Sequence, residues 1–372
     1  MADSTPAPTS TPTAADDGVV RMRPESSLAK VLPTFILEVL EFWATFITIH
    51  YMQWFWFVSF GLYYLHTIGY TYVSLGLILA YLPIFFNGAH LKPTPEVGGM
   101  QCDYIRMHPI WHLVSSYLKI DIVREAKLDP SKQYVFGGHP HGILILNRLS
   151  TFGGHFETLF PGIKARLLGA TPMFYIPLAR ELSFAMNAVD ASAKNAARVL
   201  NSKISCIVFP GGSKEIFLTD PKSKETTLVL SDRLGFVKLA IRHGADLVPF
   251  FAFGEKWIYN MWNPPKSVRH FFLQTIKVPF LVFWGRFGTW MPLRLTGNRR
   301  FGVVYGKPIS VTKNENPTDE EIAVLHAIYV ERVKELFAKY KTEFGYDDDE
   351  TLVIVSSKRP HASKSESAKK SD

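Results

Sequence analysis

The sequence predicts an α/β domain preceded by an N-terminal hairpin of hydrophobic helices, and two observations support this fold class. From Phe42 to Leu91 there is no Asp, Glu, Lys or Arg, an uncharged run of 50 residues. Because one membrane crossing takes about 20 residues, this run suffices for two helices joined by a short turn. After Lys92, short apolar runs bounded by Gly or Pro alternate with longer amphipathic stretches. Strands separated by helices in this way favour a largely parallel sheet.

The composition favours a membrane partner and a reducing compartment. Hydrophobic residues make up 47% of the chain and charged residues only 20%, whereas an average soluble domain has roughly 25% charged residues. The formal charge of +8 favours an anionic partner, but the basic residues are dispersed along the chain, which disfavours nucleic acid. The two cysteines, Cys102 and Cys206, provide neither a disulfide framework nor a zinc-binding spacing.

The N-terminal part is predicted to consist of a disordered tail and the hairpin. Residues 1–27 are rich in Ser, Thr, Pro and Ala, a composition that predicts disorder. The hairpin is predicted over 28–91, with spans near 42–65 and 67–86. A re-entrant hairpin that does not fully cross the membrane and a buried hairpin of a soluble core are the alternatives. Both membrane forms return the chain to the side from which it started.

The α/β domain is predicted over 92–350, with a C-terminal tail over 351–372. The expected strands are Gln133–Phe136, Ile204–Phe209, Asp246–Phe253 and Gly302–Tyr305, and the expected helices are Asp190–Leu200, Asp232–His243 and Asp319–Phe344. Gly244 is expected to end the second of these helices. Thr318 and Glu321 match a capping box at the start of the third.

Two segments of this domain are predicted to have a packing or surface role. The last helix carries an apolar stripe that includes Tyr329, which predicts core packing rather than a functional site. Residues 271–295 are aromatic but are interrupted by Lys277, Pro279 and Arg286, which disfavours a third membrane helix. We interpret this segment as surface lying in the headgroup layer or as the wall of an acyl channel, with ordinary core packing as an equally good alternative.

Two histidines one residue apart are the first candidate catalytic groups. They lie in F-G-G-H-P-H-G-I at 136–143, where Pro140 favours an extended His139 and the glycines leave room for a substrate. Side chains two positions apart in an extended segment face the same way. His139 and His141 could therefore share a zinc ion, but no third ligand follows at a suitable spacing. A neutral imidazole can instead take a proton from an attacking hydroxyl. A turn with a purely structural role is the third alternative.

The motifs of two other mechanisms are missing. The closest match to the nucleophile elbow G-x-S-x-G is at 211–215, where Glu215 replaces the last glycine. Neither G-x-G-x-x-G nor a Walker loop occurs. The sequence therefore does not support a covalent serine mechanism or nucleotide chemistry of these kinds.

Four motifs in this order resemble the type-2 diacylglycerol acyltransferases and their monoacylglycerol and wax-ester relatives. The motifs are H-P-H-G at 139–142, P-L-A-R at 177–180, F-P-G-G-S-K-E at 209–215 and R-L-G-F-V-K-L-A-I-R-H-G-A-D-L-V-P at 233–249. The likeness runs from the hairpin to the helix that ends near Phe344. It implies a domain like that of the glycerol-phosphate acyltransferases, a more distant family.

The chain departs from that more distant family at two positions. Leu144 stands where those enzymes have an Asp, so His141 becomes the candidate for the residue that orients His139. Gly211 replaces the acidic residue of their loop, which fits an acceptor without a glycerol phosphate to bind.

The resemblance implies an O-acyltransferase that moves a fatty acyl group from acyl-CoA to diacylglycerol and makes triacylglycerol. His139 is then the general base with His141 beside it, and no acyl-enzyme, metal or cofactor is required. The residues expected to bind substrate are Arg180, Pro210, Gly211, Gly212, Ser213, Glu215, Arg233, Lys238 and Glu255. Of these, Arg180, Arg233 and Lys238 are candidates for the phosphates of coenzyme A. A monoacylglycerol or long-chain alcohol acceptor is the nearer alternative, and a membrane metallohydrolase or a non-catalytic lipid-droplet protein is more distant.

The last four residues predict an address in the endoplasmic reticulum. Lys369 and Lys370 match a retrieval signal that is read in the cytosol. With an even number of spans, this signal predicts an endoplasmic-reticulum membrane protein with both termini in the cytosol. The expected partners are fatty acyl-CoA, diacylglycerol and membrane lipids, and nucleic acid is not expected. Lipid droplets as a second location and a homo-oligomer are left open.

Overall fold

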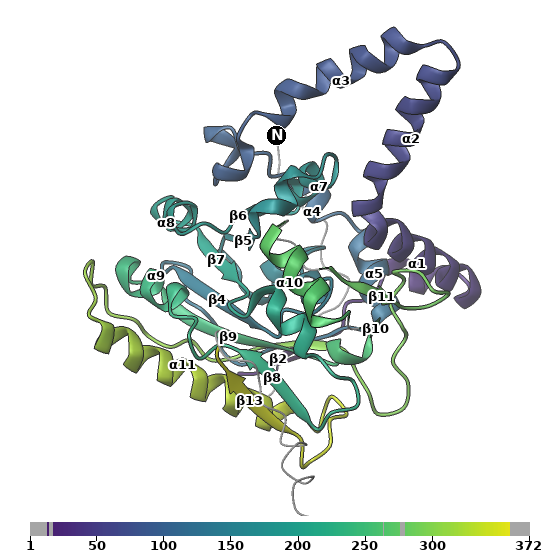
Figure 1. Ribbon diagram of the computed structural model, residues 1–372. Coiled ribbons are helices and arrows are strands. Elements are labelled where there is room, and N and C mark those ends of the chain that lie inside the picture. The colour runs from purple at the N-terminus through teal and green to yellow at the C-terminus, as the bar shows by residue number, and fades with distance from the viewer. Residues whose placement is uncertain (1–12, 15–17, 263, 276–279, 358–372) are drawn as a thin grey trace, which may run out of the picture.

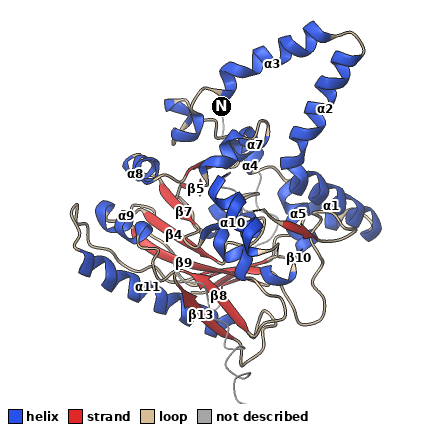
Figure 2. Ribbon diagram, in the orientation of Figure 1, coloured by secondary structure: helices blue, strands red, loops and turns tan. Residues whose placement is uncertain are grey.

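The computed structural model describes residues 13–14, 18–262, 264–275 and 280–357, and its centre is a mixed sheet (Figure 2). Within the described residues the sheet has nine strands in the order β1-β2-β3-β12-β9-β4-β7-β5-β6. They are β1 Thr13–Ala14, β2 Val20–Met22, β3 Asp121–Arg124, β4 Tyr134–His139, β5 Ala165–Gly169, β6 Ala188–Asp190, β7 Ser205–Val208, β9 Asp246–Phe253 and β12 Gly302–Tyr305. Two small sheets pair β8 (Glu225–Val229) with β13 (Thr351–Val355) and β10 (Asn260–Trp262) with β11 (Val282–Trp284).

The central strands are parallel, as the sequence predicts, but the sheet as a whole is mixed. Strand β4 pairs in parallel with both β7 and β9, and β5 pairs in parallel with β6 and β7. Strand β12 runs antiparallel to β9 and parallel to β3. The predicted strands Asp246–Phe253 and Gly302–Tyr305 coincide with β9 and β12, whereas β4 extends three residues beyond its predicted end, to His139.

Helices cover both faces of the sheet because alternate side chains of each strand point to opposite faces. Val135 belongs to a core that includes residues of α8, α9 and α11, and Phe136 to a core that includes residues of α5, α6 and α7. The helices are α1 Thr34–Ile49, α2 Trp54–Thr67, α3 Thr71–Phe85, α4 Asp103–Arg106, α5 Ile110–Leu118, α6 His155–Leu159, α7 Ala179–Ala185, α8 Ala193–Asn201, α9 Gly235–His243, α10 Lys266–Thr275 and α11 Asp319–Tyr340. The capping box at Thr318 and the left-handed Gly244 that ends α9 are confirmed.

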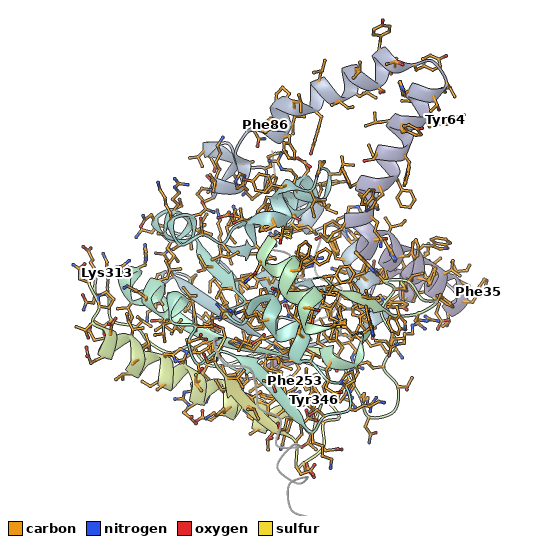
Figure 3. The ribbon with its side chains drawn as sticks, in the orientation of Figure 1. Phe35, Tyr64, Phe86, Phe253, Lys313 and Tyr346 are labelled. Carbon is orange, nitrogen blue, oxygen red and sulfur yellow. The ribbon has the colours of Figure 1, made fainter. Side chains whose placement is uncertain are left out.

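Helices α2 and α3 leave the domain and meet at an apex (Figure 1). Their connection passes through Gly69, whose φ of 93° suits glycine. Both helices expose large apolar side chains (Figure 3), for example Phe57 at 71% and Tyr72 at 90% exposure. By length and composition, two helical stretches, Thr34–Thr67 and Thr71–Leu91, suffice to cross a membrane among the described residues.

The first predicted span, 42–65, is divided between two helices. Helix α1 packs against α5 and buries Ala44, Thr45 and Ile49. A 3-10 turn at His50–Gln53 then changes the direction of the chain. Of the two helices that share this predicted span, α1 lies on the domain and α2 projects from it. The prediction of one continuous span was wrong because the absence of charge does not show which part of an apolar run packs on the protein core and which part projects from it.

Each of the two predicted tails, 1–27 and 351–372, contains a strand that pairs with the rest of the domain. Strand β2 pairs with β3 in the main sheet and buries Val20 and Met22. Strand β13 pairs in parallel with β8 over its whole length. The proposed retrieval signal at 369–372 lies outside the described residues.

The described parts of the aromatic segment, 271–275 and 280–295, form the end of α10, strand β11 and a loop, and Lys277 and Pro279 lie outside the described residues. Phe271 and Phe287 are exposed, at 59% and 72%, whereas Met291 is fully buried. The segment therefore combines aromatic surface with core packing.

Candidate active site

Three sequence motifs meet at one edge of the main sheet. Strand β4 ends at His139 and lies between β7 and β9, both of which are parallel to it. The carboxyl ends of parallel strands share an edge, so the segments after β7 and β9 adjoin the H-P-H-G turn. The first of these segments carries Glu215 and the second carries Glu255. The structure thus brings together two histidines and two carboxyl groups that the sequence predicts as site residues.

His139 is fully buried and its ring is held by a tyrosine from α11. The ring Nε2 lies 3.0 Å from the Tyr329 hydroxyl, which in turn donates a hydrogen bond of 3.0 Å to the Gly137 carbonyl oxygen. Because the Tyr329 proton is used on this carbonyl, the imidazole must carry its own proton on Nε2 and donate it to Tyr329. The other nitrogen, Nδ1, is buried and has no hydrogen-bond partner among the described residues. Burial lowers the pKa of His139 to about 3, so the ring is neutral and Nδ1 holds a free lone pair.

The two glycines before His139 make this arrangement possible. A Cβ on Gly137 would lie 2.0 Å from the Tyr329 hydroxyl oxygen, and one on Gly138 would lie 2.2 Å from the Phe250 ring. No side chain can occupy such positions without displacing these rings. The G-G pair therefore admits the tyrosine that contacts His139.

His141 does not orient His139, which corrects the sequence-based prediction. Its Nδ1 lies 2.8 Å from the carbonyl oxygen of Gly142, and its backbone N–H donates to Glu215 over 2.7 Å. No hydrogen bond joins the two histidines in the described part of the chain, and the orienting contact comes from Tyr329 instead. The sequence analysis missed the Tyr329 contact because a tyrosine in an apolar helical stripe is typical of core packing. Its hydroxyl could have indicated a polar contact, because a buried tyrosine hydroxyl needs a hydrogen-bond partner.

Glu215 and Glu255 tie the H-P-H-G turn to its neighbours. Glu215 accepts hydrogen bonds from the backbone N–H groups of His141 and Val229, at 2.7 and 2.9 Å. Glu255 accepts one from the Leu146 N–H at 3.0 Å. Burial raises the pKa of Glu215 to about 7 and that of Glu255 to about 8. Glycines make room for both, because a Cβ on Gly211 or Gly142 would lie 1.9 or 2.0 Å from the respective carboxyl group.

The raised pKa values predict that Glu215 and Glu255 contribute less to stability as the pH rises. An unfolded glutamate loses its proton near pH 4.3, whereas folded Glu255 keeps its proton up to about pH 8. Between these values Glu255 is protonated in the native state and ionised in the unfolded state, so its contribution to the free energy of unfolding falls with increasing pH. Glu255→Gln is therefore expected to reduce the difference between the melting temperatures at pH 5.5 and pH 8 by about 2 °C or more.

Differential scanning fluorimetry of the purified protein measures this difference. The control is Glu331→Gln, which removes an exposed carboxylate paired with Lys334. An unchanged pH dependence in Glu255→Gln would contradict the buried, protonated carboxyl group.

Arg180 is a structural residue in this arrangement and not an accessible phosphate ligand, which corrects its predicted role. It is 1% exposed, and its Nη1 donates to the carbonyl oxygens of Ile84 and Phe85 at 3.2 and 2.5 Å. These carbonyls belong to the C-terminal end of α3, where a cation offsets the helix dipole. The guanidinium also lies against the rings of Phe85 and Phe184, at 4.8 and 5.1 Å. The P-L-A-R motif thus anchors the hairpin to the domain.

The remaining predicted residues lie on the loop after β7 or on α9. Pro210, Gly211, Gly212 and Ser213 follow β7, and the preceding Phe209 ring lies 6.0 Å from the ring of His141. Arg233 reaches this loop through its Nη2, which lies 3.5 Å from the Gly211 carbonyl oxygen. Lys238 lies half-buried on α9 and forms no ion pair or hydrogen bond with His139 or His141 within the described chain.

A small pocket with mainly apolar walls adjoins the turn. Its apolar lining includes Pro140, Ile143 and Met261, and Glu255 and Lys256 lie in the same wall. Lys256 is neutralised by a buried ion pair with Glu350 at 2.5 Å. The pocket has a volume of about 20 Å³, which is room for about one water molecule.

The chain matches known proteins across most of its length. A family model described as diacylglycerol acyltransferase matches residues 69–355. The 2-acylglycerol O-acyltransferase 1 of Mus musculus is 36% identical over 280 residues, which cover 70% of this chain and 81% of that protein. Diacylglycerol O-acyltransferase 1 of Schizosaccharomyces pombe is 36% identical over 259 residues, or 65% of this chain and 72% of that protein. Diacylglycerol O-acyltransferase 2 of Danio rerio is 31% identical over 340 residues, or 86% and 88%.

One solved structure was also found, the 1-acyl-sn-glycerophosphate (LPA) acyltransferase PlsC from Thermotoga maritima. The match covers 82% of this chain and 96% of that chain, with 16% identity and a TM-score of 0.35. No statement about the fold or the site rests on a likeness at this level.

Proposed function

Because the chain belongs to the diacylglycerol acyltransferase family and is an O-acyltransferase of acylglycerols, we propose that it acylates the free hydroxyl of diacylglycerol. The donor is a fatty acyl-CoA and the product is triacylglycerol. The observation that carries the proposed chemistry is the free Nδ1 lone pair of neutral His139 at the edge of the sheet where the other motifs meet. The reaction requires no metal or cofactor.

In the proposed reaction His139 acts as the general base. Its Nδ1 takes the proton of the acceptor hydroxyl as the oxygen attacks the thioester carbonyl carbon. A new C–O bond forms, the C–S bond breaks, and the leaving thiolate takes the proton back from the imidazolium. The backbone N–H groups of Gly211 and Ser213, in the loop after β7, are candidates to stabilise the oxyanion. Opening of the buried site by bound substrate is part of this proposal, because catalytic hydrogen bonds often form only in the complex.

We propose that the hairpin holds the enzyme at a membrane surface, because α2 and α3 expose large apolar side chains. Helix α2 has 14 residues and α3 has 15, which at about 1.5 Å per residue gives lengths of about 21 and 22 Å. The hydrocarbon core is about 30 Å thick, so α2 and α3 alone fall short of a full crossing, although the longer stretches Thr34–Thr67 and Thr71–Leu91 suffice for one. We propose the re-entrant form, which enters and leaves from one side. Location in the endoplasmic reticulum, with both termini in the cytosol, and movement to lipid droplets belong to the same proposal.

The acceptor is tested by incubating the purified protein with radiolabelled oleoyl-CoA and equal amounts of diacylglycerol, monoacylglycerol and hexadecanol. The neutral lipids are then separated. Labelled triacylglycerol is expected to form fastest, because diacylglycerol is the proposed acceptor. Faster formation of labelled diacylglycerol would assign monoacylglycerol as the acceptor, and faster formation of wax ester would assign the long-chain alcohol. Monoacylglycerol is the principal alternative, because one relative is named 2-acylglycerol O-acyltransferase.

A further inference from the structure

A strongly basic pocket opens at the same edge of the sheet as the two histidines. It is a cavity of about 440 Å³ that includes five cations in its lining, Arg23, Lys119, Arg294, Arg299 and Arg300, and no Asp or Glu. None of these cations was singled out by the sequence motifs. A concave surface with this charge attracts anions.

Three of the five cations have no carboxylate partner in the described parts of the chain. Arg23 is neutralised by Asp121, to which it donates two hydrogen bonds of 2.7 Å. Arg294 lies 3.6 Å from both Glu38 and Glu41. Lys119, Arg299 and Arg300 form no ion pair with a described residue. The pocket thus retains a net positive charge after its internal pairs are counted.

Two of the guanidinium groups are held in place by aromatic rings. Arg299 lies over the Trp257 ring at 4.8 Å, and Arg294 lies over the Tyr117 ring at 4.7 Å. Stacking fixes a guanidinium without using its N–H donors. The N–H donors of Arg299 are therefore left available to a ligand, whereas those of Arg294 also face Glu38 and Glu41.

The strand register places the pocket beside the proposed base. His139 in β4 pairs with Phe251 in β9, and Phe253 in β9 pairs with Gly302 in β12. Gly302 in turn pairs with Asp121 in β3. Because β12 runs antiparallel to β9, the residues just before Gly302 and Asp121 lie at the edge where β4 ends. Adjacent strands are about 4.8 Å apart, so β12 and β3 lie two and three strand spacings, about 10 and 15 Å, from β4 across the sheet.

A direct contact also links the pocket to the site. A Cβ added to Gly254 would lie 2.1 Å from the Arg300 carbonyl oxygen, so the chain around Arg300 packs closely against the residue that precedes Glu255. The pocket and the carboxyl group beside the H-P-H-G turn are therefore built on adjoining backbone.

We propose that this pocket binds the phosphate groups at the nucleotide end of acyl-CoA, an inference that rests on the proposed function. Acyl-CoA carries a diphosphate and a phosphomonoester at that end, and its flexible arm separates them from the thioester. Guanidinium groups match phosphate in geometry and charge. The sequence analysis assigned the coenzyme A phosphates in part to Arg180, but Arg180 is buried and bonded to α3. The basic pocket provides accessible cations for this role instead.

The test compares a full and a truncated donor. The double variant Arg299→Gln/Arg300→Gln is expected to raise the KM for oleoyl-CoA about tenfold or more, because it removes charge-assisted hydrogen bonds to phosphate. Its KM for oleoyl-pantetheine, which lacks the nucleotide, is expected to stay at the wild-type value. Arg332→Gln serves as the control, because it removes an exposed cation on α11 that is paired with Glu335. Equal KM changes for both donors, or none, would overturn the assignment.

Two further measurements distinguish a wrong pocket assignment from a wrong acceptor, and a nucleotide ligand from a lipid headgroup. Calorimetric binding of 3′-phosphoadenosine 5′-phosphate requires no turnover, so its loss in the double variant supports the pocket even if the proposed acceptor is wrong. Flotation with vesicles containing phosphatidylserine tests lipid headgroups as the source of the phosphate. If the double variant loses vesicle binding while its KM for oleoyl-CoA is unchanged, the pocket is a membrane contact and the nucleotide assignment fails.

Discussion

Replacing His139 with Gln is expected to lower kcat for acyl transfer by a factor of about 10² to 10⁴. Glutamine can still donate an N–H toward Tyr329, but it has no lone pair basic enough to take the hydroxyl proton. The Nδ1 of His139 makes no hydrogen bond with the described chain, so the substitution breaks no hydrogen bond at that atom. Turnover of purified protein with saturating oleoyl-CoA and diacylglycerol measures the effect.

Two matched variants make this result specific. His243→Gln changes a histidine at the end of α9 whose Nδ1 lies 3.0 Å from the Leu239 carbonyl oxygen, and it is expected to keep wild-type kcat. His141→Gln retains its backbone bond to Glu215 and is expected to lower kcat less than His139→Gln. Normal turnover of the His139 variant, or a larger loss in the His141 variant, would contradict the assignment of the base.

Replacing Tyr329 with Phe is expected to lower kcat about tenfold with little change in KM. The hydroxyl accepts the Nε2 proton of His139 and donates to Gly137. Its removal leaves a buried donor and a buried acceptor unpaired, which costs about 1–3 kcal/mol for each group. Without this hydroxyl, the imidazole of His139 no longer favours the tautomer that is protonated on Nε2 and has a free lone pair on Nδ1. Tyr329 is therefore a positioning residue that acts through His139.

A double-mutant cycle separates this role from a general loss of packing. If Tyr329 acts through the base, His139→Gln/Tyr329→Phe has the same kcat as His139→Gln alone. The control is Tyr340→Phe on the same helix, where the lost hydroxyl bonds Glu125 at 3.2 Å. Independent, additive losses from the two substitutions would show that Tyr329 supports the fold and not the base.

The elements that the sequence predicts well are those whose signals are local. Strand β9 is an apolar run that ends before Gly254, and α9 ends at a glycine in the left-handed region. The strands that were missed depend on partners far along the chain. Strand β2 has only three residues and is ordered by pairing with β3, and β13 is ordered by β8. Such short segments carry no periodic signal of their own.

The site shows the same division between local and distant signals. Motifs predict that His139, Glu215 and Glu255 belong to one site, because each lies at or after the carboxyl end of one of three mutually parallel strands. Tyr329 lies 190 positions from His139 in the chain, and only the packing of α11 under the sheet brings its hydroxyl to the ring. The role of Arg180 could not be predicted either, because a guanidinium suits helix carbonyls as well as phosphate.

The most direct measurement of the central claim follows labelled acyl groups through one reaction of the purified protein with oleoyl-CoA and diacylglycerol. Direct transfer from thioester to hydroxyl predicts one coenzyme A released for each triacylglycerol formed, with no label retained on the denatured protein. The rate is expected to fall by about 10² to 10⁴ in His139→Gln. Release of coenzyme A without an ester product, or label bound covalently to the protein, would contradict direct transfer by a histidine base.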